Sequence, residues 1–361
     1  MVFTNSACAH FIGIYDCMKG WVLTCILAAF SAGAMAEGDS LTVVRVNKQR
    51  HFKQEVPAGN YSGLAPIGEG RYAVVSDKSK TDGFFVFEIG VDSVDGSVEH
   101  VRNLGFYSDG AKNRDVEAVV FLPQTRTLML AGEADGRVVE VDLQGRRTGR
   151  VLDVGQTLKG CTGEYGLESL AYDAASQTFW TCAESTLKGD GARATSVNGA
   201  VNRIRLQSYD AQLRPLEQYA YQMDAPRAHK RAAKFAHGVS ELLALADGSL
   251  LVLEREVFVS KKKIGSFVVN KLYRVVPDKS LAINANSPLD ESVSFVGKQL
   301  VTSWRTSISL LGRKLANFEG MCLGPRTADG GQVIIFVADS QDQYGGILRD
   351  WFKTIVVDIS R

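Results

Sequence analysis

The segment that decides the fold is Val116–Glu133, with the sequence VEAVVFLPQTRTLMLAGE. It holds two apolar runs, VEAVV at residues 116–120 and LMLAGE at residues 128–133, joined by a short turn-forming stretch. Two such runs around a tight turn are typical of an antiparallel β-hairpin. One acid, Glu117, lies near the start of the hairpin and another, Glu133, ends it.

The same unit occurs five times along the chain. The other copies are YSGL and YAVVSD (61–64, 72–77), LESLA and FWTCAE (167–171, 179–184), SELLA and LLVLE (240–244, 250–254), and FEGM and VIIFVAD (318–321, 333–339). Internal repeats of this length are typical of propellers and related arrays. The repeat therefore indicates one architecture built from five similar hairpins.

Antiparallel pairing places the polar residue of each first run beside the acid that ends the second run. Pairing Glu117 with Glu133 centres the turn on Thr125, and pairing Glu168 with Glu184 centres it on Ser176. Pairing Glu241 with Glu254 likewise centres the turn on a segment rich in turn-forming residues, Asp247-Gly248. We therefore expect all the acids at one end of their hairpins.

About two further strand-like runs follow each hairpin, which gives four strands per repeat. The runs lie at residues 84–89, 98–104, 137–143, 201–209, 219–223, 268–275, 293–301 and 354–359. Four-stranded repeats around an axis are the blades of a β-propeller. The chain is predicted to be all-β with five blades, and Leu41–Val46 supplies the missing outer strand of the last one. Six blades stay open if residues 256–316 hold a degenerate repeat, and a β-sandwich is the alternative fold.

The N-terminus has the pattern of a secretory signal. Lys19 precedes the apolar run Trp21–Phe30, and Ala34-Met35-Ala36 offers a small-residue cleavage site. We therefore predict a signal peptide over residues 1–36, a single propeller domain over residues 37–361, and a periplasmic or secreted protein. An uncleaved membrane anchor is the alternative, although the apolar run is short for a span.

Composition limits the classes of partner and of thiol chemistry. The net charge of +1 gives no field that would favour nucleic acid. We expect a monomer that binds a small-molecule ester or other polar ligand, with no stable membrane span after cleavage. An exported protein can form disulfides, and Cys161–Cys182 is the predicted pair, with three buried free thiols, including Cys322, as the alternative.

Strand order predicts that the acids share one face with most of the long connections. Those connections are residues 185–200, 225–238, 256–265, 304–317 and 340–353, and residues 226–236 and 307–316 look helical. Long loops are often functional. The acid face is therefore predicted to be the working one.

Several carboxylates that converge on one channel mouth repel one another unless a cation neutralises them. Calcium is the expected cofactor because it accepts many oxygen ligands in loose geometry. The predicted metal ligands are Asp77, Glu117, Glu133, Glu184, Glu241, Glu254 and Asp339. Each acid can instead cap a blade by accepting backbone N–H groups or pairing with a basic residue. Lys78, His237 and Arg255 are the predicted substrate-binding residues, because cations bind phosphate esters.

The hairpin motifs resemble a known family of propellers. The most specific stretches are YGLESL at residues 165–170, NFEGM at 317–321 and VADS at 337–340. They resemble the phytase-like family, also called esterase-like activity of phytase, over roughly residues 55–360. The resemblance implies a propeller that hydrolyses esters, although the better-known propeller phytases look six-bladed and calcium-rich.

Two functions stay open at this point. The first is an exported, metal-assisted hydrolase of phosphate or carboxylate esters, with Glu168 or Glu319 as the catalytic base. The second is a non-catalytic binding or scaffold propeller of the cell envelope. Fold alone does not decide between them.

Overall fold

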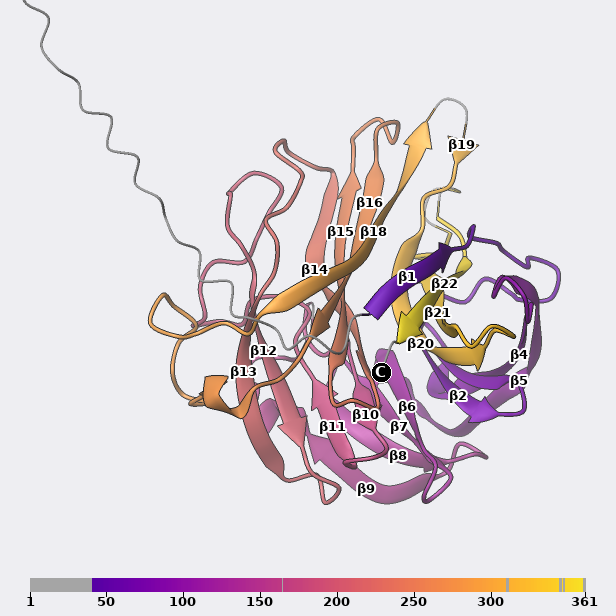
Figure 1. Ribbon diagram of the computed structural model, residues 1–361, viewed down its shortest axis with the longest axis horizontal. Coiled ribbons are helices and arrows are strands. Elements are labelled where there is room, and N and C mark those ends of the chain that lie inside the picture. Colours follow the sequence, from indigo (N-terminus) through magenta and orange to yellow (C-terminus); the bar gives the residue numbers. More distant parts are fainter. Residues whose placement is uncertain (1–40, 164, 310–311, 344–345, 347, 360–361) are drawn as a thin grey trace, which may run out of the picture. The chain divides into compact units, whose positions relative to one another are not determined.

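The computed structural model describes residues 41–163, 165–309, 312–343, 346 and 348–359, and these residues form an all-β propeller (Figure 1). Its five sheets are antiparallel, and two of them carry a short fifth strand. The described residues include two complete 3₁₀ turns, η1 (Val154–Gln156) and η2 (Lys279–Leu281). Among the described residues, no helix is long enough and apolar enough to cross a membrane. The predicted signal peptide lies outside the described residues.

Each sheet is one blade, numbered here in the order of its innermost strand along the chain. Blade 1 is β2 (Tyr61–Gly68), β3 (Arg71–Ser76), β4 (Thr81–Val91) and β5 (Val98–Lys112). Blade 2 is β6 (Val116–Leu122), β7 (Thr127–Gly132), β8 (Arg137–Asp142) and β9 (Arg147–Asp153). Blade 3 is β10 (Ala171–Asp173), β11 (Thr178–Thr181), β12 (Arg203–Tyr209), β13 (Pro215–Gln222) and the short β17 (Ala282–Ile283).

The last two blades complete the set. Blade 4 is β14 (Lys234–Ala244), β15 (Leu250–Val259), β16 (Phe267–Val275), β18 (Lys298–Ser309) and the short β19 (Gly312–Arg313). Blade 5 is β20 (Asn317–Arg326), β21 (Gln332–Asp339), β22 (Phe352–Ile359) and β1 (Leu41–Val46). Residues 256–316 therefore belong largely to blade 4 and hold no sixth blade.

The innermost strands form a closed ring. β2 lies beside both β6 and β20, β10 lies beside β6 and β14, and β14 lies beside β20. A separate apolar cluster fills each of the five gaps between neighbouring blades. One pair from each cluster is Phe84 with Val119, Met129 with Phe179, Leu206 with Val252, Leu251 with Phe336, and Phe87 with Ile335. Both faces of each inner strand are buried, which is why the hairpins read as continuous apolar runs.

The two ends of the described chain meet in blade 5. β1 pairs antiparallel with β22, from Leu41 opposite Ile359 to Val46 opposite Ile355. This pairing confirms the prediction that the N-terminal run closes the ring. Closure also covers the free edge that β22 would otherwise present.

Four of the inner strands carry a one-residue β-bulge at the same place. Ser62, Glu117, Ser240 and Glu319 each lie between two paired neighbours without a partner of their own. In blade 3 the same shift falls between Leu167, which bridges to Ala183, and Ala171, which pairs with Trp180. Bulges re-aim side chains and are common beside active sites.

The bulges correct the predicted pairing of the acids in every blade: Glu117, for example, has no partner and so does not pair with Glu133. The same holds in blade 4. Glu254 pairs with Val239 and Glu241 pairs with Leu253, so these two acids are not opposite each other. The residue that follows the bulge partner Glu254 in β15 is Arg255, which pairs with Gly238. In the other four blades this position holds Asp77, Glu133, Glu184 and Asp339.

Three further expectations are wrong. Residues 226–233 form an irregular segment rather than a helix, and Lys234–Gly238 belong to β14. Ser307–Ser309 end β18 rather than start a helix. Cys161, Cys182 and Cys322 are buried free thiols, so the predicted disulfide is absent, and Cys182 lies 3.2 Å from the Ser169 hydroxyl.

Docking of β1 can be tested with two substitutions in the same strand. Leu41 is 7% exposed in the cluster between blades 4 and 5, whereas Val44 is 52% exposed and lies at the bulge of β1. We expect Leu41→Ala to lower the free energy of unfolding by about 2 kcal/mol because buried hydrocarbon is lost. Val44→Ala should change it by less than about 0.5 kcal/mol. Urea unfolding measures both, and equal stabilities would show that β1 does not close the ring.

Candidate functional site

A cavity of about 900 Å³ opens at the end of the channel where the bulges of the inner strands lie. Its walls are rich in carboxylates. The predicted site residues that line it are Asp77, Lys78, Glu117, Glu133, Glu168, Glu184, Arg255 and Glu319. Glu117 and Glu319 come from bulges, and Asp77, Glu133, Glu184 and Arg255 come from the residue just after the bulge partner. The repeated hairpin geometry therefore gathers these side chains.

Arg255 organises one half of the ring of carboxylates. Its guanidinium donates to Glu184 of blade 3 and to Glu319 of blade 5, the two blades that flank its own. All three side chains are almost fully buried. Asn317 accepts from Arg255 at 3.2 Å and donates to Glu319 at 2.8 Å. The buried guanidinium of Arg255 and the carboxylates of Glu184 and Glu319 form one hydrogen-bonded unit.

Gly238 makes that unit sterically feasible. It is the register partner of Arg255, so a side chain there would lie on the same face of the sheet as the guanidinium. A Cβ on Gly238 would lie 2.4 Å from Cγ of Glu184. The missing side chain therefore leaves the space through which Glu184 reaches Arg255.

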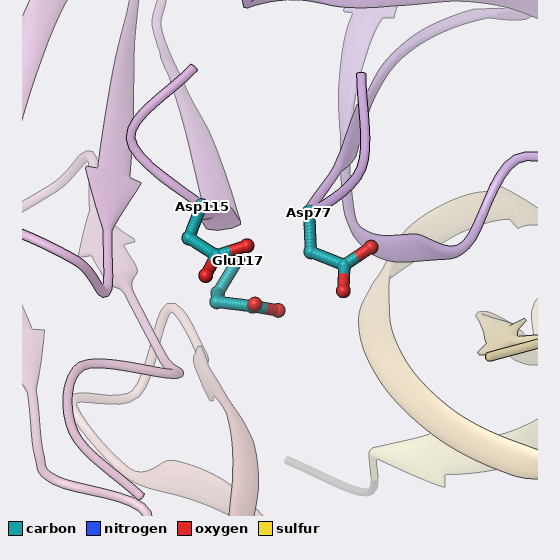
Figure 2. Close-up of side chains that lie close together, drawn as sticks. All are labelled: Asp77, Asp115 and Glu117. Carbon is teal, nitrogen blue, oxygen red and sulfur yellow. The ribbon is translucent and has the colours of Figure 1, made fainter. Parts of the chain in front are cut away.

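The half of the ring on blades 1 and 2 has no arginine. Carboxylate oxygens of Asp77, Asp115 and Glu117 all lie within 4.8 Å of one another, and Figure 2 shows Asp115 and Glu117 facing Asp77. Lys78 is the nearby cation, with its Nζ 2.7 Å from Asp77 Oδ2 and 3.1 Å from Asp115 Oδ1. Asp77 Oδ1 is buried and has no hydrogen-bond partner among the described residues. Three carboxylates with one partly exposed lysine leave excess negative charge.

Burial and mutual repulsion raise the pKa values of this half of the ring. Burial, and then the charge of Asp339, raises the pKa of Asp77 to about 7. Burial likewise raises the pKa of Glu133 to about 7, although Glu133 accepts a hydrogen bond from the Gly166 N–H. The pKa of Glu117 lies well above its usual value because of burial and then the charge of Glu168. These carboxyls therefore hold protons near neutral pH unless a cation binds.

Glu168 makes no hydrogen bond to any described residue. It is half-buried and lines the cavity. Burial, and then the charge of Glu184, raises its pKa well above the usual value. An unengaged carboxyl with a raised pKa is suited to proton transfer.

The structure does not bring four of the predicted site residues to this cavity. Glu241 accepts the N–H groups of Leu170 and Leu242 and is 1% exposed. Glu254 accepts hydrogen bonds from Tyr221 of blade 3 at 2.7 Å and from Lys298 of its own blade at 2.6 Å. These two acids were predicted as metal ligands, but neither lines this cavity.

Asp339 and His237 also lie outside the cavity lining. Asp339 is fully buried and accepts the Gln341 N–H at 2.7 Å. His237 faces a smaller pocket of about 310 Å³ and contacts Asn202, and burial lowers its pKa to about 4. Neither residue lines the cavity, although Asp339 is close enough for its charge to raise the pKa of Asp77.

Sequence reasoning missed Asp115, which completes the carboxylate cluster. Asp115 has a left-handed φ of 61° and lies two residues before the bulge at Glu117. No other repeat has an acid at this position, so the repeat did not point to it. Its one local signal is the preceding Asn113, whose side chain accepts the Asp115 N–H at 3.0 Å, as in turns that tolerate left-handed residues.

Because the pKa of Glu133 is raised, we predict that Glu133→Gln stabilises the folded protein by an amount that depends on pH. A carboxyl with a raised folded-state pKa contributes its stability below pH 4.5, and that stability is lost as the pH rises to about 7. Without divalent cations, the stability of Glu133→Gln relative to the unsubstituted protein should therefore grow from about pH 4 to about pH 7. Thermal unfolding in chelator measures this, with exposed Glu99→Gln as the control. A constant difference would contradict the assignment.

Removing Arg255 should destabilise the folded protein, because the two carboxylates that it neutralises then stay buried without a cation. We expect Arg255→Met to destabilise the protein by about 3–5 kcal/mol, because Glu184 and Glu319 stay buried without a partner. The triple variant Arg255→Met/Glu184→Gln/Glu319→Gln should recover most of the loss. Chemical unfolding measures both. A triple variant as unstable as the single one would show that the ion pairs are not the cause.

Comparison with known proteins adds structural and family relationships. The endo-arabinase from Bacteroides thetaiotaomicron VPI-5482 is similar over 85% of this chain and 95% of that chain, with 10% identity and a TM-score of 0.43. A duf4221 family member from Bacteroides vulgatus is similar over 90% and 99%, with 8% identity and a TM-score of 0.39. A streptogramin B lyase covers 87% and 98%, with 10% identity and a TM-score of 0.36. Such distant likenesses carry no argument about activity.

No curated protein matches the sequence. A family model does match, and its span of residues 56–341 begins before the first hairpin and ends after the last. It therefore contains every bulge and every carboxylate of the cavity except Asp342. The chain belongs to the phytase-like family, described as esterase-like activity of phytase.

Proposed function

We propose that this protein is a cation-dependent hydrolase of phosphate or carboxylate esters that acts in the acidic cavity. The observation that carries the proposal is the cluster of Asp77, Asp115 and Glu117, whose oxygens lie within 4.8 Å of one another. The cluster lies in the wall of the same cavity as Lys78 and the unengaged Glu168. Membership of the phytase-like family supports the reaction class.

The residues of the cluster fit a hard divalent cation. All three side chains offer carboxylate oxygens, the ligands that calcium accepts, and Asp77 Oδ1 is buried without a hydrogen-bond partner among the described residues. We therefore assign Asp77, Asp115 and Glu117 as the ligands of a bound cation. A cation there would polarise an ester oxygen and lower the pKa of a bound water.

The residues of the chain itself divide the remaining work. Lys78 is about half exposed beside the cluster, so its ammonium can bind an ester oxygen. Glu168 acts as the general base, because a raised pKa makes its carboxylate a stronger base than an ordinary glutamate. Glu319 and Arg255 bind each other, and they hold the cavity floor in place rather than transfer protons.

One observation favours the second candidate, a binding propeller without catalysis. Arg255 neutralises Glu184 and Glu319 within the protein, so part of the ring of acids needs no ligand. In that account the cavity holds a cation or polar ligand in the cell envelope. Export itself rests on the signal pattern in residues 1–36, and N-terminal sequencing of the secreted protein would test it.

Calcium titration by calorimetry tests the cation site. We expect Asp115→Asn to weaken calcium binding by about tenfold or more, because a charged ligand is lost. The control is Asp109→Asn, an acid of the same strand region that lies outside the cavity. No calcium binding by the unsubstituted protein would contradict the assignment.

Ester hydrolysis separates the two candidates. With phosphate and carboxylate esters in the presence of calcium, we expect turnover that Glu168→Gln lowers by about 10²–10⁴-fold while calcium affinity is retained. The exposed Glu99→Gln should keep full activity. Calcium binding without turnover of any ester would reject the hydrolase and leave the binding propeller.

A further inference from the structure

Blade 4 extends beyond the ring of carboxylates as a β-sheet arm. Arg255 pairs with Gly238 at the level of the ring, and the pairing continues past it to Lys234 opposite Val259. β16 and β18 continue the arm from Asn270 opposite Trp304 to Phe267 opposite Ser307 (Figure 1). Residues 234–237 and 256–259 therefore stand above the cavity floor.

The arm gives the cavity an apolar wall. Ala236 and Val257 are register partners and share one face of the sheet, as do Lys234 and Val259. Both pairs line the cavity, together with Phe235. We define the apolar wall as Phe235, Ala236, Val257, Val259 and Leu348, all of which line the cavity.

Packing behind the wall holds it in place. Val257 packs on a separate apolar cluster of Val268, Ile308, Leu315 and Leu348, which belongs to none of the five interblade cores. Leu348 is 4% exposed, whereas Phe235 and Val257 are half-buried. The wall is therefore a preformed surface, and the half-buried side chains leave apolar area open to the cavity.

The part of the wall that blade 4 supplies lies across the channel from the carboxylate cluster. Asp77 comes from blade 1 and Asp115 and Glu117 from blade 2, and blade 4 neighbours only blades 3 and 5 in the ring. One cavity thus presents charged oxygens on one side and hydrocarbon on the other. A ligand that spans it needs one polar and one apolar end.

We propose that the apolar wall binds the hydrocarbon part of the substrate, so that the protein takes esters with an aromatic or aliphatic group rather than esters of polyhydroxylated polyanions. This inference rests on the proposed function and names its substrate class. Hydrocarbon that moves from water onto the wall contributes binding free energy in proportion to the area buried. A fully polar substrate gives up its own hydrating water against the wall and finds no hydrogen-bond partner there.

The charge of the cavity points the same way. Among the described residues, eight carboxylates line it, namely Asp77, Asp115, Glu117, Glu133, Glu168, Glu184, Glu319 and Asp342, against the three basic residues Lys78, Lys234 and Arg255. One divalent cation and three basic residues leave the ionised cavity short of positive charge. A substrate with several phosphate groups is therefore repelled, whereas an ester with one anionic group, or none, is tolerated.

Two non-hydrolysable probes test the inference on the full protein with calcium. Benzylphosphonate and methylphosphonate carry the same anionic group, and only the first has an aromatic group for the wall. Calorimetry should show benzylphosphonate binding about tenfold or more tightly. Val257→Thr, which keeps the shape of the side chain and replaces a methyl group with a hydroxyl, should reduce that ratio severalfold without changing the affinity for methylphosphonate.

Two further variants keep the test interpretable. Phe235→Ser changes a second wall residue and should reduce the ratio in the same way. Ile264→Thr is the matched control, because Ile264 is 54% exposed in the connection between β15 and β16 and does not line the cavity. Equal affinities for the two phosphonates, or a ratio that neither wall variant changes, would overturn the inference and leave the proposed function standing.

The neutral probe 2-naphthol separates the two claims if neither phosphonate binds. That result would reject the proposed anion and cation site. Fluorescence-detected binding of 2-naphthol that Val257→Thr weakens would then support the apolar wall alone. Failure of 2-naphthol to bind would overturn the wall as well.

Discussion

The site depends on one departure from the repeat, the arginine at position 255. Four hairpins end in a carboxylate at this point, and five carboxylates in its place would repel one another inside a buried ring. Arg255 binds Glu184 and Glu319 on either side and so neutralises the half of the ring on blades 3, 4 and 5. The other half keeps its excess negative charge. The asymmetry of the cavity therefore follows from a single residue in a register set by the bulges.

The closed ring and the bulges together fix which residues of the inner strands lie at the channel mouth. Each inner strand is packed on both sides by apolar clusters, so the bulge residues cannot turn away from the channel mouth. The opposite end of the channel is lined by apolar side chains from all five inner strands, among them Leu64, Val120 and Leu323. Polar ligands thus have one suitable end of the channel. At that end, charged oxygens, an unengaged Glu168 and the apolar wall meet in one cavity.

Much of the fold could be predicted because its signals are local. Apolar runs with turn residues between them predicted the hairpins, their number predicted the five blades, and the unpaired last repeat predicted the role of Leu41–Val46. The site was harder because a bulge shifts the register by one residue without a mark in the sequence. Glu241 and Glu254 look like the acids of the other repeats. In the structure Ser240 is the bulge residue, and Arg255 is the residue that follows the bulge partner. Asp115 has no counterpart in the other hairpins, and the arm of blade 4 extends strands through segments whose charge and alanine content look helical.

A crystal structure grown in calcium tests the central claim most directly, because it locates the cation without reference to any substrate. The account predicts one strong density peak coordinated by oxygens of Asp77, Asp115 and Glu117, with the ammonium of Lys78 displaced from Asp77 and with Arg255 still bound to Glu184 and Glu319. Anomalous scattering from a heavier lanthanide at the same place would identify the peak as a cation. A cluster that keeps Lys78 between Asp77 and Asp115 at saturating calcium, with the cation elsewhere or absent, would contradict the account.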